Sequence, residues 1–91
     1  MASKDYMRYV DECIERALVS AKFKFYTHEN KGIANYESLE RLLELLEGEV
    51  AELKEAIESG KKEHIQSECG DVVVYASLIL DYIALKGKVV K

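Results

Sequence analysis

The chain contains no proline, and this absence constrains its fold more than any other feature of the sequence. Proline costs about 3 kcal/mol in a helix interior, so a chain without it is free to form long uninterrupted helices. Only five glycines occur, while hydrophobic residues make up 48% and charged residues 33%, a composition typical of globular proteins. We therefore expect an all-α protein and a single domain over residues 1–91.

Apolar residues recur at helical spacing along three segments of the chain. The first segment runs from about Lys4 to about Tyr26, and residues 27–34, which are mostly small or polar, read as a loop. The second opens near Asn35, a favourable N-cap residue, and stops at Gly60. These signals predict two helices joined by a loop.

The third helix is predicted from about Lys62 to about Lys86. A strand over residues 72–76 is the main alternative, because this run is rich in valine and β-prone. The helical spacing extends well beyond strand length on both sides, which favours a helix. Because a short glycine-lysine turn joins the second and third helices, they should form an antiparallel hairpin beside the N-terminal helix.

The apolar surface of these helices exceeds what one chain can cover. A chain this short buries only about 60% of its unfolded surface when it folds alone. The third helix is apolar over more than half its circumference from Val72 onwards. The second carries a continuous heptad-like seam of six residues, Leu39, Leu43, Leu46, Val50, Leu53 and Ile57. We expect a partner subunit and a helical bundle built across subunits.

Charge and hydropathy exclude several classes of protein. The net charge of −4 argues against a nucleic-acid polymer as partner, although a nucleotide can approach an acidic site through divalent cations. No segment approaches the roughly 18 consecutive apolar residues of a membrane span. The polar N-terminus does not resemble a signal peptide, so a cytoplasmic location is expected. Cys13 and Cys69 make neither a disulfide framework nor a paired metal-ligand spacing.

Four acidic residues fall on or beside the apolar arcs of the hairpin rather than on its polar side. Glu49 and Glu52 lie three residues apart on the second helix, as do Glu68 and Asp71 on the third. Residues at this spacing are neighbours on a helix surface, so each pair can converge on one point. The antiparallel hairpin can then bring the four carboxylates together.

Two interpretations of these acidic pairs remain open. Such pairs occur by chance in helical proteins, and an edge glutamate can reach water or pair with a lysine such as Lys54. Four carboxylates in a partly dry space otherwise repel one another unless a cation neutralises them. Ligation by oxygen alone selects hard cations, so Mg²⁺, with Mn²⁺ as a possible substitute, is the ion we expect.

The motif formed by these pairs resembles that of the MazG-like all-α nucleoside triphosphate pyrophosphohydrolases. It stands here as Glu49-Val-Ala-Glu52 followed by Glu68-Cys-Gly-Asp71, and the resemblance covers about residues 20–85. It implies hydrolysis of a nucleoside triphosphate, standard or modified and ribo or deoxy, to a nucleoside monophosphate and pyrophosphate. Such activity would serve housecleaning of the nucleotide pool.

The resemblance also implies roles for individual residues. Glu49, Glu52, Glu68 and Asp71 would hold Mg²⁺, and one glutamate that is not fully used as a ligand, Glu52 in our assignment, would act as general base. Glu49 is the second candidate catalytic residue. The relatives imply a homodimer or a dimer of dimers.

Substrate contacts are expected from the segment before the catalytic helices. The resemblance implies that Lys24, His28 or Lys31 offsets triphosphate charge, and that a nearby aromatic residue stacks on the base. Tyr75 is a further candidate for a nucleotide contact. The alternative is that the lysines are solvated and that the aromatic residues, Tyr75 included, belong to the core.

Two other functions compete with this one. A catalytically silent helical dimerisation or regulatory module would keep the heptad seam but would have no use for inward carboxylates. Phosphoribosyl-ATP pyrophosphohydrolase shares the fold and the metal chemistry, but the lysine-rich run that we associate with its first acidic motif is missing here.

Overall fold

The computed structural model describes residues 3–27 and 38–86, in which the chain forms three helices. They are α1 (Lys4–Thr27), α2 (Leu39–Ser59) and α3 (Lys62–Lys86). The all-α prediction is confirmed, and the β-prone run at 72–76 lies within α3. In this run the β propensity of the valines is overridden, because a helix buries the apolar residues of the run and of its flanks on one packed face.

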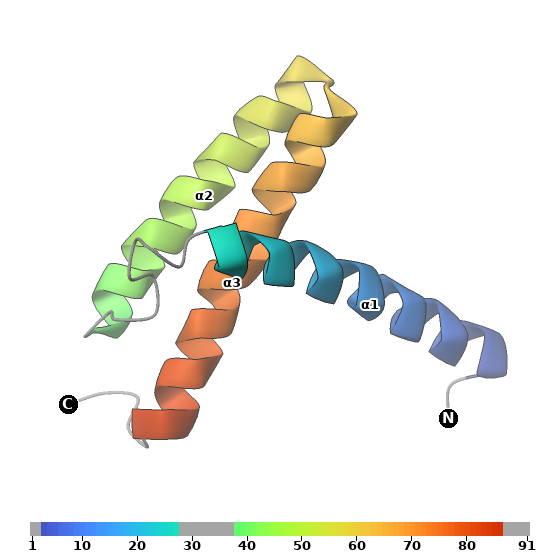
Figure 1. Cartoon of the computed structure of the whole chain (residues 1–91), viewed down its shortest axis with the longest axis horizontal. Helices are drawn as coiled ribbons and strands as arrows, with labels where there is room; N and C mark the ends of the chain where they lie inside the picture. The colour runs from blue at the N-terminus through green and yellow to red at the C-terminus, as the bar shows by residue number, and fades with distance from the viewer. Residues whose placement is uncertain (1–2, 28–37, 87–91) are drawn as a thin grey trace.

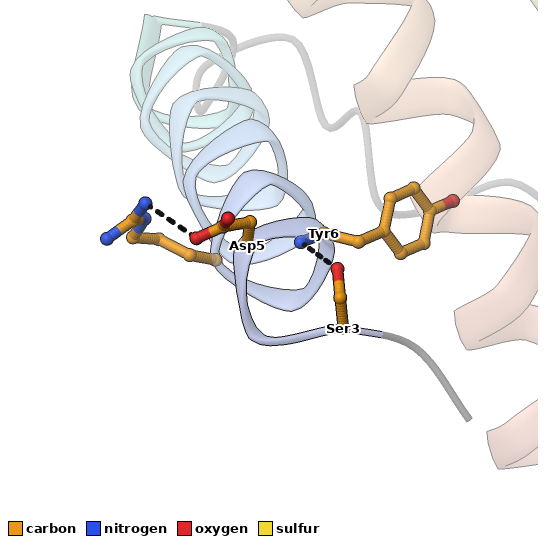
Figure 2. A network of polar contacts seen from close by, with 4 residues as sticks. Ser3, Asp5 and Tyr6 are labelled. Atoms are coloured by element: carbon orange, nitrogen blue, oxygen red, sulfur yellow. Dashed lines mark hydrogen bonds and ion pairs between the residues drawn. The ribbon is translucent and has the colours of Figure 1, made fainter.

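A serine begins α1. The Ser3 hydroxyl accepts a hydrogen bond from the Tyr6 backbone N–H at 3.1 Å, and Arg8 donates to the Asp5 carboxylate at 3.2 Å (Figure 2). The serine satisfies one of the backbone N–H groups that a helix leaves unpaired in its first turn. Asp5 in that turn also interacts favourably with the helix dipole.

A serine is also the N-cap of α2, which corrects our prediction of where this helix starts. Ser38 has extended backbone angles, φ −141° and ψ 150°, and its hydroxyl accepts from the Arg41 backbone N–H at 3.1 Å. The helix therefore starts at Leu39 and not near Asn35, which lies outside the described residues. Serine is about as good an N-cap as asparagine, and here its hydroxyl satisfies a backbone N–H in the first turn of α2.

Gly60 ends α2 as predicted. Its φ of 73° lies in the left-handed region that glycine adopts without strain. The Gly60 backbone N–H donates to the carbonyl oxygens of Ala56 at 3.2 Å and Ile57 at 3.1 Å. The chain then reverses, and α3 returns antiparallel beside α2 (Figure 1).

The core lies where α3 meets the other two helices. In the described residues α1 and α2 each pack on α3, and α1 makes no close backbone approach to α2. Figure 1 shows the C-terminal end of α1 crossing the middle of α3 while the rest of α1 leads away from the hairpin. The buried cluster consists of Ala21, Leu42, Val74, Tyr75 and Leu78. This arrangement places α1 and α2 against the middle of α3.

Only part of the heptad seam of α2 packs inward, with Leu46 against the buried core. Leu42 and Ala56, which share the neighbouring arc, are the buried residues of α2. Leu43, Val50 and Ile57, at intervals of seven, are each about half exposed. The antiparallel hairpin therefore uses the arc that also carries Glu49, and half of the seam remains uncovered.

The N-terminal half of α1 is uncovered as well. The apolar side chains of Met7, Val10 and Ile14 are exposed, whereas Ala21 near the other end of the helix is buried. The radius of gyration is 14.9 Å. A compact chain of this length has about 12 Å, so the molecule is more extended than its size requires. None of the described helices has the length and apolar character needed to cross a membrane.

Two glycine-to-alanine substitutions test this description of α2. Gly60→Ala should destabilise the protein by about 1 kcal/mol, because alanine is strained at positive φ. Gly48→Ala should stabilise it by about 0.5–1 kcal/mol, because Gly48 lies inside the helix and a Cβ there meets no atom within 4 Å. Urea denaturation measures both changes, and the same sign for the two would contradict the assigned end of α2.

Candidate metal centre

Three carboxylates converge between the two helices of the hairpin. Glu49 on α2 and Glu68 and Asp71 on α3 each offer one oxygen, and the three oxygens lie within 4.8 Å of one another. Glu49 shares the arc of α2 that faces α3 with Leu42 and Ala56, and Glu68 and Asp71 lie one turn apart on α3. The geometry follows from the antiparallel pairing of two helices that each carry acidic residues on their inner arc.

The cluster is largely removed from solvent. Glu68 and Asp71 are each 7% exposed, which is unusual for carboxylates, and Glu49 is partly buried. The Oδ1 atom of Asp71 is buried and has no hydrogen-bond partner among the described residues. A buried oxygen without a partner carries the desolvation penalty uncompensated, so this atom lacks a donor or a cation.

Burial and mutual repulsion shift the protonation of the cluster. Burial, followed by the charges of Glu52, Asp71 and Glu68, raises the pKa of Glu49 from 4.5 to about 7. Burial, followed by the charge of Asp71, also raises the pKa of Glu68. Both shifts mean that the charged cluster is unfavourable in the absence of added positive charge.

The one cation that contacts the cluster comes from α1, as far as the described residues go. Lys24 Nζ lies 3.3 Å from Asp71 Oδ2, and the two side chains are only 17% and 10% exposed. The lysine charge also acts against the upward pKa shifts of Glu49 and Glu68. The Lys24 ammonium therefore offsets part of the negative charge of three carboxylates, and His64 also lowers the pKa of Glu68.

The donor set suits a hard divalent cation. All three groups offer carboxylate oxygens, and no histidine or cysteine of residues 3–27 and 38–86 contributes. Cys13 and Cys69 are free and exposed. Mg²⁺ prefers oxygen ligands and uses a few carboxylates while it keeps other positions for water or phosphate. An ion among these carboxylates would also supply the partner that Asp71 Oδ1 lacks.

Glu52 lies outside the group of three. It is exposed, one turn beyond Glu49 on α2. Its charge nevertheless raises the pKa of both Glu49 and Glu68, so it lies close to the cluster. The fourth carboxylate of the motif is therefore a neighbour of the cluster on its solvent side.

The candidate substrate residues are distributed differently. Lys24 reaches the cluster, whereas Tyr75 is buried in the core one turn beyond Asp71. His28 and Lys31 lie outside the described residues. Of the aromatic residues near the end of α1, Phe25 packs against the core and Tyr26 is exposed.

Sequence reasoning missed two features of the site. We expected Lys24 to meet phosphate, but we did not foresee its pairing with Asp71. We also gave Gly70 no role, although a glycine inside a helix costs about 1 kcal/mol relative to alanine and signals a local constraint. A Cβ at Gly70 would lie 3.2 Å from the Ser20 carbonyl oxygen, so the glycine allows α1 to approach α3 closely.

The carboxylate cluster lies in the part of the chain that matches a known family. The model of the MazG nucleotide pyrophosphohydrolase domain matches residues 37–89, which include α2, α3 and all four acidic residues of the motif. The chain belongs to the MazG family. Membership indicates nucleotide pyrophosphohydrolase activity in general. Neither the search of curated proteins nor the search of solved structures gives a match.

The raised pKa of Glu49 predicts how the stability of this MazG domain depends on pH without divalent ions. Between 4.5 and about 7 the folded protein keeps a proton on Glu49 that the unfolded chain has lost. The contribution of this group to stability is therefore present at low pH and is lost as the pH rises to about 7. Glu49→Gln should remove this loss and stabilise the metal-free protein above neutral pH.

Urea denaturation in a chelator, at about pH 5 and about pH 8, measures the effect. Glu55→Gln is the matched control, because Glu55 is an exposed glutamate of the same helix. Equal effects of the two substitutions at both pH values would contradict a repulsive cluster around Glu49.

Proposed function

We propose that this MazG domain hydrolyses nucleoside triphosphates to nucleoside monophosphates and pyrophosphate with the help of Mg²⁺. The observation that carries the proposal is the cluster of Glu49, Glu68 and Asp71, whose oxygens lie within 4.8 Å of one another. One of its buried oxygens, Oδ1 of Asp71, has no partner. A purely structural helical module gains nothing from burying such groups, because unpaired buried charge is destabilising.

The three clustered carboxylates would be the metal ligands. A bound Mg²⁺ acts as a Lewis acid on phosphate oxygens and lowers the pKa of water. Glu49 would hold the ion from α2, while Glu68 and Asp71 would hold it from α3. Ligands from both helices tie the site to the hairpin, so the rigid pairing of α2 with α3 would fix the ligand geometry.

Glu52 is the residue that we assign as general base. It lies close enough to the cluster to influence two of its members electrostatically, yet it is exposed and outside the group of three. It can therefore accept a proton from a water molecule that attacks the α-phosphorus. The bond from that phosphorus to the oxygen that bridges to the β-phosphate breaks, and pyrophosphate leaves with the bridging oxygen. Glu49 would take part in catalysis through the ion.

Positive charge near the cluster would help to hold the triphosphate. Lys24 brings its ammonium to Asp71 and so to the position that metal-bound phosphates would approach. We assign His28 and Lys31 to the same task, on the strength of the motif resemblance alone. We assign Tyr75, which lies in the core one turn beyond Asp71, to the nucleotide site. Standard or modified nucleotides are both candidate substrates, the latter in a housecleaning role.

A panel of nucleoside and deoxynucleoside triphosphates with pyrophosphate detection tests the activity. We expect pyrophosphate release with Mg²⁺ or Mn²⁺ and none in a chelator. Even groups that merely support metal ligands affect activity by 10–100-fold, so Asp71→Asn and Glu49→Gln should each lower kcat/KM by about 100-fold or more. Glu55→Gln, the exposed control, should retain activity. Unchanged activity in the Asp71 variant, or orthophosphate as the first product, would contradict the assignment.

We also propose that the active form contains a second copy of the chain, as a homodimer or a dimer of dimers. In the described residues only six apolar side chains are buried, whereas fourteen large ones are exposed. The exposed residues Leu43, Val50 and Ile57 repeat every seven positions, which is the spacing of a helix–helix interface. An exposed apolar area of this kind marks an interaction surface in a small domain.

An aspartate placed in this stripe tests the assembly. Ile57→Asp should weaken self-association by at least about 10-fold, because it buries a charge at an apolar contact. Lys54→Asp is the matched control, since it also adds an aspartate to α2 but replaces an exposed lysine. Sedimentation equilibrium measures the association. A monomeric wild-type protein at micromolar concentration would overturn the proposal.

A further inference from the structure

The ion pair between Lys24 and Asp71 differs from the other two ion pairs of the described residues. Those pairs, Arg8–Asp5 and Arg41–Glu44, are local pairs within one helix whose side chains are more than half exposed. Surface pairs of this kind contribute little to stability. The Lys24 pair joins two helices and is mostly buried, so its charges interact more strongly and its formation affects the acidic cluster directly.

Gly70 makes this pair possible. A Cβ at Gly70 would lie 3.0 Å from Lys24 Cγ and 3.2 Å from the Ser20 carbonyl oxygen. The aliphatic stem of Lys24 therefore lies directly over Gly70, and its ammonium reaches Asp71 in the next position of α3. Because lysine is flexible and has a single charged end, it can hold this carboxylate and also release it.

The two oxygens of Asp71 have different environments. Oδ2 is paired with Lys24, whereas Oδ1 is buried and has no partner within the part of the chain that the structure describes. Oxygens of Glu49 and Glu68 lie within 4.8 Å of the Asp71 oxygen that completes the cluster. A divalent cation among the three carboxylates would hold two positive charges close to the Lys24 ammonium, and like charges at this distance in a partly dry space repel strongly.

We propose that Lys24 is a built-in competitor of the divalent cation: its ammonium neutralises Asp71 in the metal-free protein and leaves that carboxylate when the ion binds. This inference rests on the proposed metal site. Lys24 acts on the ion through Asp71 and is therefore a positioning residue rather than a ligand. In the metal-free protein, Lys24 gives Asp71 a counterion. Because this ion pair must break when the divalent cation binds, it lowers the affinity of the site for the cation. The displaced ammonium is then free to meet the phosphates of the nucleotide.

Calorimetric titration with Mg²⁺ or Mn²⁺ alone, without nucleotide, tests the competition. Lys24→Met should bind the ion about 10-fold more tightly than the wild type, because binding no longer breaks the buried ion pair with Asp71. Lys22→Met is the control for net charge, since Lys22 is an exposed residue of α1, and its affinity should stay at the wild-type value. In a chelator Lys24→Met should melt at a lower temperature than Lys22→Met, and excess Mg²⁺ should close the gap.

A second measurement needs no variant and covers the case in which Lys24→Met does not fold. The NMR signal of the Lys24 ammonium in the wild-type chain should report an ion pair in a chelator and should change when Mg²⁺ is added. The competition is overturned if Lys24→Met binds the ion with the same or lower affinity than the wild type, or if the Lys24 signal does not change when Mg²⁺ is added. Either result leaves the proposed metal site intact. If the wild type binds no divalent ion, both the competition and the proposed function fail.

Discussion

Repulsion among carboxylates enclosed between two helices is the constraint on which the rest of this structure depends. The hairpin places Glu49 against Glu68 and Asp71, and burial deprives these groups of the water that would otherwise screen them. The fold can tolerate this arrangement only with positive charge nearby or with protons on the carboxylates. The raised pKa values, the buried ion pair and the unpartnered oxygen are three consequences of this one conflict. Because a divalent cation would relieve the repulsion among these carboxylates, the cluster is well suited to bind one.

The N-terminal helix is part of this site, although the family match covers only residues 37–89. Its last turns cross α3 at Gly70 and bring Lys24 to the carboxylates (Figure 1). A hairpin alone would leave the charge of the cluster without this counterion. The crossing also covers the core at Ala21. Gly70 thus lets α1 pack closely on α3, and this packing brings the charge of Lys24 to the carboxylates.

The remainder of α1 and the outer stripe of α2 leave apolar side chains exposed, which supports the proposal of a second copy of the chain. Their exposed apolar residues outnumber the buried ones, and the protein is extended because α1 leads away from the hairpin. Small domains commonly gain their missing stability from association.

Local patterns in the sequence determined the helices, the turn at Gly60 and the inward arcs of the acidic pairs, because each depends on residues within a few turns of one another. Helical periodicity placed Glu49, Glu68 and Asp71 on apolar arcs, and the hairpin turn made it possible to expect that they meet. Only the tertiary structure decided which arc of α2 faces α3 and that Lys24 pairs with Asp71. These outcomes depend on the crossing of helices far apart in sequence. Periodicity along one helix fixes which residues share a face, whereas the partner of that face is selected by the packing of all three helices together.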